Sequence, residues 1–211
     1  MFNGYSHILN ILHKKLELLL INLNNNIEYR FTLTNYALMK STLIIFSSTD
    51  GQTQKICEKI MEFEKNKNDS QIASISESRN IDLSKFQRII IGASIRYGKH
   101  KSDLYEFIES NINEISNKEN AFFSVNVVAR KDEKNTPDTN PYMKKFLLKT
   151  SWKPKSLAVF AGKIDYPKYN FIDKNMIRFI MWMTKGPTDT KNTYEFTDWD
   201  AVDKFAMKVI S

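Results

Sequence analysis

The sequence predicts an α/β protein built on a doubly wound, five-stranded parallel sheet with helices on both faces. Short, nearly continuous apolar runs recur along the chain, as expected of strands buried on both faces. Segments with helical spacing of apolar residues separate these runs, and the loop after the first run is rich in hydroxyl groups. Strands that alternate with helices in this way form parallel sheets.

The expected elements follow one another from residue 41 onward. The expected strands are 41–46, 71–75, 88–93, 121–128 and 157–161. The expected helices are 52–64, 103–115, 141–149 and 198–210, the last with Asp198 as its N-cap. Because ligands of such sheets bind beyond the carboxyl ends of the strands, the residues that follow the strands are the candidates for a site.

Residues 1–38 differ from the regular pattern. Apolar residues at 7–23 have helical spacing, but the apolar runs are too short to span a bilayer and no signal-peptide cleavage site follows them. We expect an N-terminal extension of doubtful function that the fold does not need, with Met39 as a natural alternative start. A helix on a membrane surface is the alternative. The expected domain is 39–211, with an insertion at about 163–196.

The composition describes one globular domain. Hydrophobic residues make up 42% and charged residues 26% of the 211 residues. The single cysteine, Cys57, lies in an apolar phase of the first helix and is expected to be a buried structural thiol. One cysteine and three histidines exclude a disulfide framework and offer little for a metal centre, so no metal is expected.

The net charge of +7 is concentrated in one segment. Residues 144–191 hold eleven Lys or Arg against three Asp, which suggests an anionic partner. Within this segment, residues 166–182 combine a wide apolar surface with several cations. One interpretation is a helix packed on the domain or on a second copy in a homo-oligomer. The other is a basic amphipathic helix at an anionic membrane surface.

The loop after the first strand is suited to a phosphate. It lies between a buried strand and a helix N-terminus, where the helix dipole and unpaired N–H groups attract anions and a glycine lets the backbone approach. The loop fits neither GxGxxG nor the P-loop pattern, and an ordinary capped turn is the alternative. Its residues are Ser48, Thr49, Asp50, Gly51, Gln52 and Thr53.

This strand, loop and helix resemble the flavodoxins, whose [ST]-x-T-G-x-T loop holds the phosphate of FMN. Asp50 stands where flavodoxins usually carry threonine. A carboxylate beside a phosphate would repel it unless the side chain turns away, for example to cap the helix.

Further motifs resemble a narrower family, the HemG-type, quinone-dependent protoporphyrinogen IX dehydrogenases, which have a flavodoxin-like fold. The resemblance runs in order from about Met39 to the C-terminus. The motifs are FS at 46–47 with DGQT at 50–53, IGASIRYG at 91–98, SVNVVARK at 124–131, TDT at 188–190 and TDW at 197–199.

The resemblance implies an FMN enzyme of haem (porphyrin) biosynthesis. It would oxidise protoporphyrinogen IX to protoporphyrin IX and pass the electrons to ubiquinone or menaquinone. It would lie peripherally on the cytoplasmic face of the bacterial inner membrane, with no nucleic-acid partner. An FMN electron carrier without its own substrate is the alternative, but such carriers usually present an acidic face.

The resemblance also implies which residues bind FMN. Tyr97 is expected to stack on the ring and Asn126 to offer its amide, while residues 130–137 resemble a mobile lid. Arg96, Lys99 or His100 could steady reduced flavin or a substrate carboxylate, or could be solvated, and no catalytic residue is assigned. The expected FMN-binding residues are the six of the phosphate loop with Ser94, Ile95, Arg96, Tyr97, Gly98, Phe122, Ser124, Val125, Asn126, Val127, Ala129, Arg130, Thr188, Asp189 and Thr190.

Overall fold

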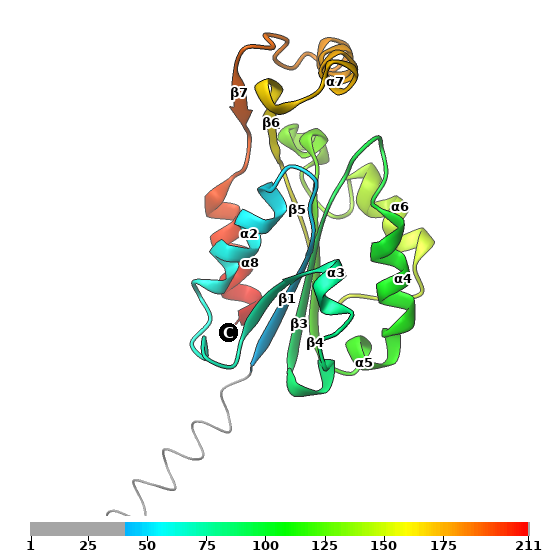
Figure 1. The fold of residues 1–211 in the computed structure, drawn as a ribbon, viewed down its shortest axis with the longest axis vertical. Coiled ribbons are helices and arrows are strands. Elements are labelled where there is room, and N and C mark those ends of the chain that lie inside the picture. The colour runs from blue at the N-terminus through cyan, green and yellow to red at the C-terminus, as the bar shows by residue number, and fades with distance from the viewer. Residues whose placement is uncertain (1–40, 211) are drawn as a thin grey trace, which may run out of the picture. The chain divides into compact units, whose positions relative to one another are not determined.

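A computed structural model describes residues 41–210, and the expected extension at 1–38 lies outside them. The main sheet is parallel and five-stranded, in the order β2-β1-β3-β4-β5 (Figure 1). Its strands are β1 Thr42–Ser47, β2 Gln71–Ser74, β3 Arg88–Ser94, β4 Glu119–Val125 and β5 Ser156–Phe160. The strand order reverses between β1 and β3, which is where ligands of doubly wound sheets bind. The predicted flavodoxin-like fold is confirmed.

Helices cover both faces of the sheet (Figure 1). On one face, Ile44 and Ile90 of the sheet pack with Ile56 and Phe205 of the helices α2 and α8. The other face packs against the remaining helices of the domain. The helices on the first face are α2 Gln52–Met61 and α8 Trp199–Ile210. The helices on the other face are α3 Ile75–Ser78, α4 Ser102–Ser110, α5 Ile112–Ser116 and α6 Pro141–Lys149. Both faces of the sheet are therefore buried under helices, as the continuous apolar strands predicted.

Several predicted elements end earlier than the apolar pattern indicates. The helix expected at 52–64 ends at Met61, and two other elements stop at an asparagine. The helix expected at 103–115 breaks into α4 and α5 at Asn111, whose Nδ2 donates to the carbonyl of Phe107 at 2.8 Å. The strand expected at 121–128 stops at Val125, and the 3-10 turn η2, Val127–Arg130, follows. In both cases an asparagine side chain bonds to nearby backbone and replaces the regular ladder.

Three other predictions for single residues or helices are confirmed. The helix at 141–149 has the predicted bounds, and Asp198 caps α8 by accepting the Ala201 N–H at 3.0 Å. Cys57 is fully buried, and burial raises the pKa of its thiol, so it is an inert packing residue.

The insertion after β5 forms a small unit of its own. Two short strands, β6 Lys163–Asp165 and β7 Thr193–Glu195, pair antiparallel, with Asp165 opposite Thr193. Between them come the turn η4, Tyr166–Lys168, and the 13-residue helix α7, Phe171–Met183. Figure 1 shows α7 beyond the carboxyl ends of the strands of the main sheet. The hairpin therefore carries the basic segment to the edge where a ligand would bind.

Candidate functional site

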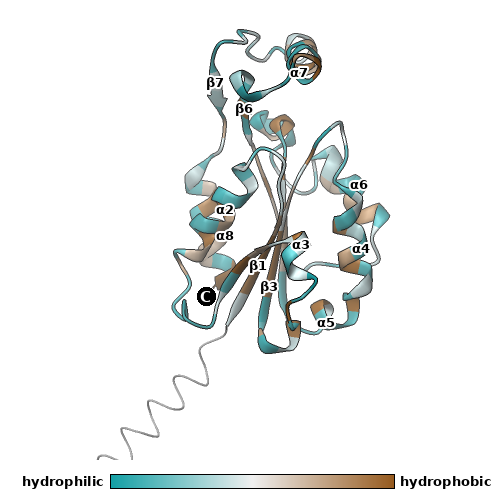
Figure 2. Cartoon of the chain, viewed as in Figure 1, coloured by the Kyte–Doolittle hydropathy of each residue, from teal (hydrophilic) through white to brown (hydrophobic). Residues whose placement is uncertain are grey.

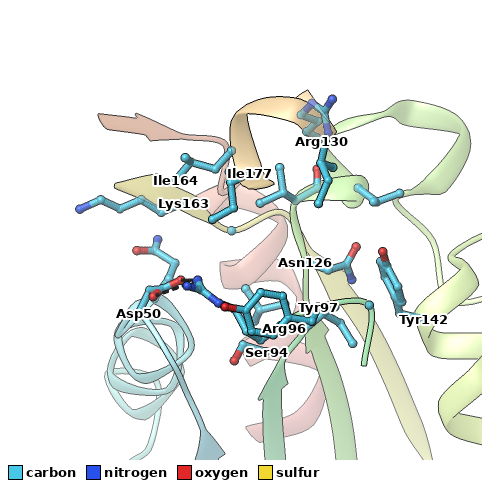
Figure 3. A pocket seen from close by; sticks show the side chains of 18 of the residues that line it. Asp50, Ser94, Arg96, Tyr97, Asn126, Arg130, Tyr142, Lys163, Ile164 and Ile177 are labelled. Carbon is cyan, nitrogen blue, oxygen red and sulfur yellow. Dashed lines mark hydrogen bonds and ion pairs between the residues drawn. The ribbon is translucent and has the colours of Figure 1, made fainter. Parts of the chain in front are cut away.

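A cavity of about 510 Å³ opens at the carboxyl ends of β1, β3 and β4 (Figure 3). The loops after these strands form its floor and sides, and the inner face of α7 forms its roof. It is therefore located at the switch point of the sheet, where the fold predicts a ligand. The lining residues from α7 are Met176, Ile177, Ile180 and Met181.

The N-terminus of α2 points unpaired donors toward this cavity. Gly51, at the N-cap, has φ +83° and supplies no side chain, so no side chain caps the helix. The hydroxyl of Thr53 is buried and has no hydrogen-bond partner in residues 41–210. The N–H of Gly51 is already used, since it donates to Ser48 Oγ at 3.0 Å. A buried hydroxyl and an uncapped helix end together suit an anion.

Asp50 does not cap this helix, although the sequence suggested that its carboxylate could. It pairs instead with Arg96, whose Nη1 lies 3.0 Å from Asp50 Oδ2. The same oxygen accepts a hydrogen bond from the hydroxyl of Tyr169 at 3.3 Å. The negative charge of Asp50 is thus turned toward a cation, which removes the conflict with a bound phosphate.

Arg96 also joins this loop to α7. Its Nη2 lies 2.6 Å from Asp173 Oδ2, in the first turn of the helix. Although burial of the guanidinium opposes its charge, Asp50 and Asp173 raise the pKa of Arg96. A hydrogen bond from Tyr97, then one from Arg96, lower the pKa of Asp173. Arg96 and Asp173 are therefore both charged at neutral pH.

Tyr97 stands at the tip of the loop after β3. Its backbone has φ +50°, which is rare for a residue with a side chain, and Gly98 follows with φ +74°. Its ring is more than half exposed and lines the cavity, while its hydroxyl donates to Asp173. The Arg96 guanidinium lies 5.3 Å from the ring centroid. An aromatic face is therefore held at the cavity, as a stacking role requires.

The loop after β4 is held by a buried amide network. Asn126 Oδ1 accepts the Ala129 N–H at 3.2 Å and Asn140 Nδ2 at 3.1 Å, and Asn126 Nδ2 donates to Ser124 Oγ at 3.2 Å. Asn140 in turn caps α6 by accepting the Tyr142 N–H at 3.0 Å. Asn126 lines the cavity, but its amide chiefly shapes the loop.

His100 is buried, which the sequence did not indicate. Its ring packs edge-on against Phe122 and Phe146, and Nδ1 lies 3.1 Å from the carbonyl oxygen of Ser94. Burial lowers the pKa of His100 to about 4, with a smaller contribution from Lys149. The ring is thus neutral at pH 7 and does not line the cavity. The solvent-exposed interpretation of His100 does not fit this position.

The structure brings most of the expected FMN-binding residues together around one cavity. Those that line it are Ser48, Asp50, Gln52, Thr53, Ser94, Ile95, Arg96, Tyr97, Gly98, Val125, Asn126, Val127 and Arg130.

The other expected residues lie outside the lining. Phe122 is fully buried and stacks on Phe146 with the ring centroids 3.8 Å apart. Ser124 and Ala129 support Asn126, and Gly51 shapes the phosphate loop, which also contains the exposed Thr49. The triplet 188–190 forms its own turn, in which Asp189 accepts the Lys191 N–H at 3.0 Å. All the expected positions, inside and outside the lining, remain predictions as contacts of FMN.

Some lining residues were not expected from the sequence. They come from α6, the insertion and the turn after β4. The insertion was interpreted as a helix packed on the domain or on a second copy, or as a membrane-surface helix, and neither interpretation named lining residues. Its apolar periodicity was visible, but no sequence signal told which side of α7 faces a cavity. The unexpected residues are Val128, Tyr142, Gly162, Lys163, Ile164, Tyr169, Met176, Ile177, Ile180, Met181 and Thr184.

The fold and this site define a protein of the flavodoxin class. Residues 43–191 match the family model described as a flavodoxin domain. Solved structures similar to the chain include a flavodoxin from the domain Archaea, with 16% identity and a TM-score of 0.40 over 72% of this chain and 99% of that one. A flavoprotein in complex with FMN from Lactobacillus acidophilus NCFM has 20% identity and a TM-score of 0.41 over 57% and 93%.

Curated relatives are more similar in sequence. The protoporphyrinogen IX dehydrogenase [quinone] of Escherichia coli (strain K12) is 40% identical over 169 residues, which cover 80% of this chain and 93% of the relative. The protein of the same name from Leishmania major is 40% identical over 166 residues, or 78% of this chain and 72% of the relative. The chain belongs to the quinone-dependent protoporphyrinogen IX dehydrogenase family, as its sequence motifs predicted.

Proposed function

We propose that this chain binds FMN and uses it to oxidise protoporphyrinogen IX to protoporphyrin IX, with a membrane quinone as the electron acceptor, in porphyrin biosynthesis. One observation carries this function beyond family membership. The cavity has an anion-accepting helix end on one side and an apolar roof from the insertion on the other. An electron carrier needs the first feature only, whereas an enzyme with a large apolar substrate needs both.

The residues at the α2 end fit the phosphate of FMN. The buried hydroxyl of Thr53 has no hydrogen-bond partner in the described chain. Gly51 has a left-handed backbone, and no atom lies within 4 Å of the position that a Cβ would take there. Such an open, uncapped helix start accepts a phosphate without rearrangement. Ser48 and the first turn of α2 would hold the phosphate, and the loops of Tyr97 and Asn126 would flank the ring.

FMN supplies the two-electron redox chemistry when bound, and three such oxidations convert the porphyrinogen to the porphyrin. The chain's own part is to position the reactants and to exclude water. Ile177, Ile180 and Met181 close the roof with apolar side chains. Among the lining residues that the structure describes, the only carboxylate is Asp50, which is paired with Arg96, and no histidine lines the cavity.

The membrane is the proposed source of the quinone. Phe171, Ile172 and Trp182 of α7 are each at least 70% exposed, and Figure 2 shows hydrophobic residues among hydrophilic ones along α7. No helix within residues 41–210 is both long and apolar enough to cross a bilayer. Peripheral binding through α7 at the anionic cytoplasmic face of the inner membrane accounts for apolar rings next to Lys174 and Arg178.

The decisive experiment is a turnover assay. The purified protein is incubated anaerobically with protoporphyrinogen IX and either ubiquinone or menaquinone analogues, and porphyrin fluorescence is followed against a control without enzyme. We expect turnover that depends on the quinone. A yellow, FMN-loaded protein that oxidises no porphyrinogen with any of the quinones would be an electron carrier. A protein that takes up no flavin would contradict both functions.

A further inference from the structure

We propose that Arg130 anchors a carboxylate of the substrate, a propionate of the porphyrinogen, at the end of the cavity remote from the phosphate site. The inference rests on the proposed function and assigns a substrate contact within that cavity. Four observations carry it: the charges that line the cavity, the contacts of Arg130, its place in the cavity and its apolar surroundings.

The lining has one cation without a carboxylate partner in the described residues. Asp50 and Arg96 neutralise each other across 3.0 Å, and Lys163 lies 3.6 Å from Asp165. Arg130 is the remaining charged residue of the lining, and no ion pair within residues 41–210 includes it. Among the charged residues of the lining, Arg130 is therefore the one without a counter-ion in residues 41–210.

Neutral oxygens hold the Arg130 guanidinium in place. Nη1 donates to the Val127 carbonyl at 3.0 Å, and Nη2 donates to the carbonyl and hydroxyl of Thr184 at 2.9 and 2.8 Å. A Cβ built on Gly186 would lie 3.0 Å from Nη2, so the group is also closely packed. Burial lowers the pKa of Arg130, which means that the site bears a desolvation cost for this charge. An anionic ligand would offset that cost.

The position of Arg130 separates this anion from the phosphate of FMN. Figure 3 shows Arg130 on the side of the cavity near Ile177, across from Asp50 and Arg96. Asp50 belongs to the loop at the N-terminus of α2, where the phosphate fits. The anion that Arg130 would bind is therefore not the FMN phosphate. It belongs to another bound molecule or to another part of the ligand.

The surroundings of Arg130 define the ligand's chemistry. Val127 and Val128 precede it in η2, and Ile177 and Met181 of α7 line the same cavity. A ligand that fits here has a large apolar body with a carboxylate at its edge, because a small polar anion would leave the apolar walls unfilled. A porphyrinogen with its propionates has this chemistry. A quinone has no carboxylate, so Arg130 distinguishes the electron donor from the acceptor.

The test compares protoporphyrin IX with its dimethyl ester as ligands of the FMN-loaded full chain, in a fluorescence titration without membranes. The wild type should bind the free acid more tightly than the ester. Arg130→Gln should weaken binding of the free acid roughly 10- to 100-fold, the range for a hydrogen-bonded charge, and leave ester binding within about twofold. Arg130→Lys should recover part of the loss. Arg79→Gln, which removes an exposed surface cation paired with Glu106, is the matched control.

Turnover adds an independent measurement. In the quinone assay, Arg130→Gln should raise KM for the porphyrinogen and leave KM for the quinone unchanged. If Arg130 only clamps Thr184, the variant weakens free acid and ester equally, and the proposal is wrong. Equal affinity of the wild type for both ligands would overturn it as well, while turnover by the wild type would still uphold the proposed function. Absence of any porphyrin binding or turnover by the wild type would overturn both.

Discussion

Arg96 joins three segments that are far apart in the sequence. Its two terminal nitrogens contact Asp50 of the phosphate loop and Asp173 of α7, and its guanidinium lies 5.0 Å from the ring centroid of Tyr169. One cation therefore neutralises a carboxylate beside the phosphate site and fixes the start of the helix that roofs the cavity. The threonine usual in flavodoxins is replaced by an acid that has its own counter-ion.

Removing this counter-ion should weaken FMN binding. In Arg96→Gln, the carboxylate of Asp50 remains beside the phosphate site without its ion-pair partner. Because Arg96 and Asp50 are both partly exposed, the effect is moderate, and we expect FMN affinity to fall roughly 5- to 10-fold. Titration of the apoprotein with FMN, followed by flavin fluorescence, measures it.

The double variant Asp50→Asn with Arg96→Gln is the matched control. It removes the repelling carboxylate together with its partner, so most of the lost FMN affinity should return. An equally weak double variant would mean that Arg96 acts through Tyr97 or α7 and not through the charge of Asp50.

His100 should make the stability of the fold sensitive to mild acid. Its pKa is lowered to about 4 in the folded chain, below the value of about 6.5 in the unfolded chain. Above pH 6.5 the ring is neutral in both states. Between pH 6.5 and 4 only the unfolded state takes up the proton, so stability falls as the pH falls, by on the order of 3 kcal/mol in total.

Urea unfolding of the wild type and of His100→Gln at several pH values measures this contribution. The wild type should be the more stable protein at pH 7, and the difference should shrink toward pH 4. A difference that does not change with pH would show that His100 is not the group that takes up the proton.

On the scale of elements, α7 has one face that lines the cavity and another that is exposed. Met181 is buried and the neighbouring apolar residues line the cavity, while Phe179 and Trp182 stack on each other with their rings 6.1 Å apart and remain exposed. Such an exposed aromatic pair next to cations is typical of helices that lie in a membrane interface. The helix thus connects the cavity to the outer surface of the insertion.

Charge reversal on α7 should weaken membrane binding. Lys174→Glu with Arg178→Glu replaces two attractive charges by two repulsive ones, so sedimentation with vesicles that contain anionic lipid should drop several-fold while FMN content stays the same. In the wild type, the vesicles should also shift Trp182 emission to the blue.

Lys144→Glu with Lys145→Glu is the control for net charge. These lysines are exposed on α6, belong to the same basic segment and change the total charge equally. They should leave vesicle binding largely intact. Unchanged sedimentation of the α7 variant, or a concentration-dependent dimer that Trp182→Ser disrupts, would mean that a second copy covers the helix instead.

The sequence predicted those elements whose signals are local. Continuous apolar runs located the five strands, and the strand ends located the two loops that flank the cavity. The pairing of Asp50 with Arg96 and Asp173 could not be predicted, because it depends on how the insertion is placed over the sheet. For the same reason, Ile177 was not recognised as a lining residue. The lining position of Tyr142 and the burial of His100 depend instead on how α6 packs against the sheet, which local patterns do not show.

At the scale of the whole molecule, the insertion starts and ends at one point. Asp165 and Thr193 are partners across the β6–β7 ladder, so residues 166–192 leave the domain and return to it side by side. A two-residue Asn-Gly turn can close such an antiparallel pair. We expect the chain with 166–192 replaced by this turn to fold cooperatively and to retain FMN with reduced affinity.

The same shortened chain should lose porphyrinogen turnover and vesicle binding, because both the roof of the cavity and the exposed aromatic surface are removed. Thermal unfolding, flavin absorbance, the quinone assay and sedimentation together measure these properties. Full turnover by the shortened chain would contradict the role of α7 in holding the substrate.

The double use of α7 has a thermodynamic consequence. A helix that contacts the substrate on one side and lipid on the other links the two binding equilibria, and such linkage is reciprocal. Any factor by which bound porphyrinogen increases the affinity for the membrane must equal the factor by which the membrane increases the affinity for porphyrinogen. Under the two proposed roles of α7, loading of the substrate and residence at the bilayer would then be coupled by one and the same factor.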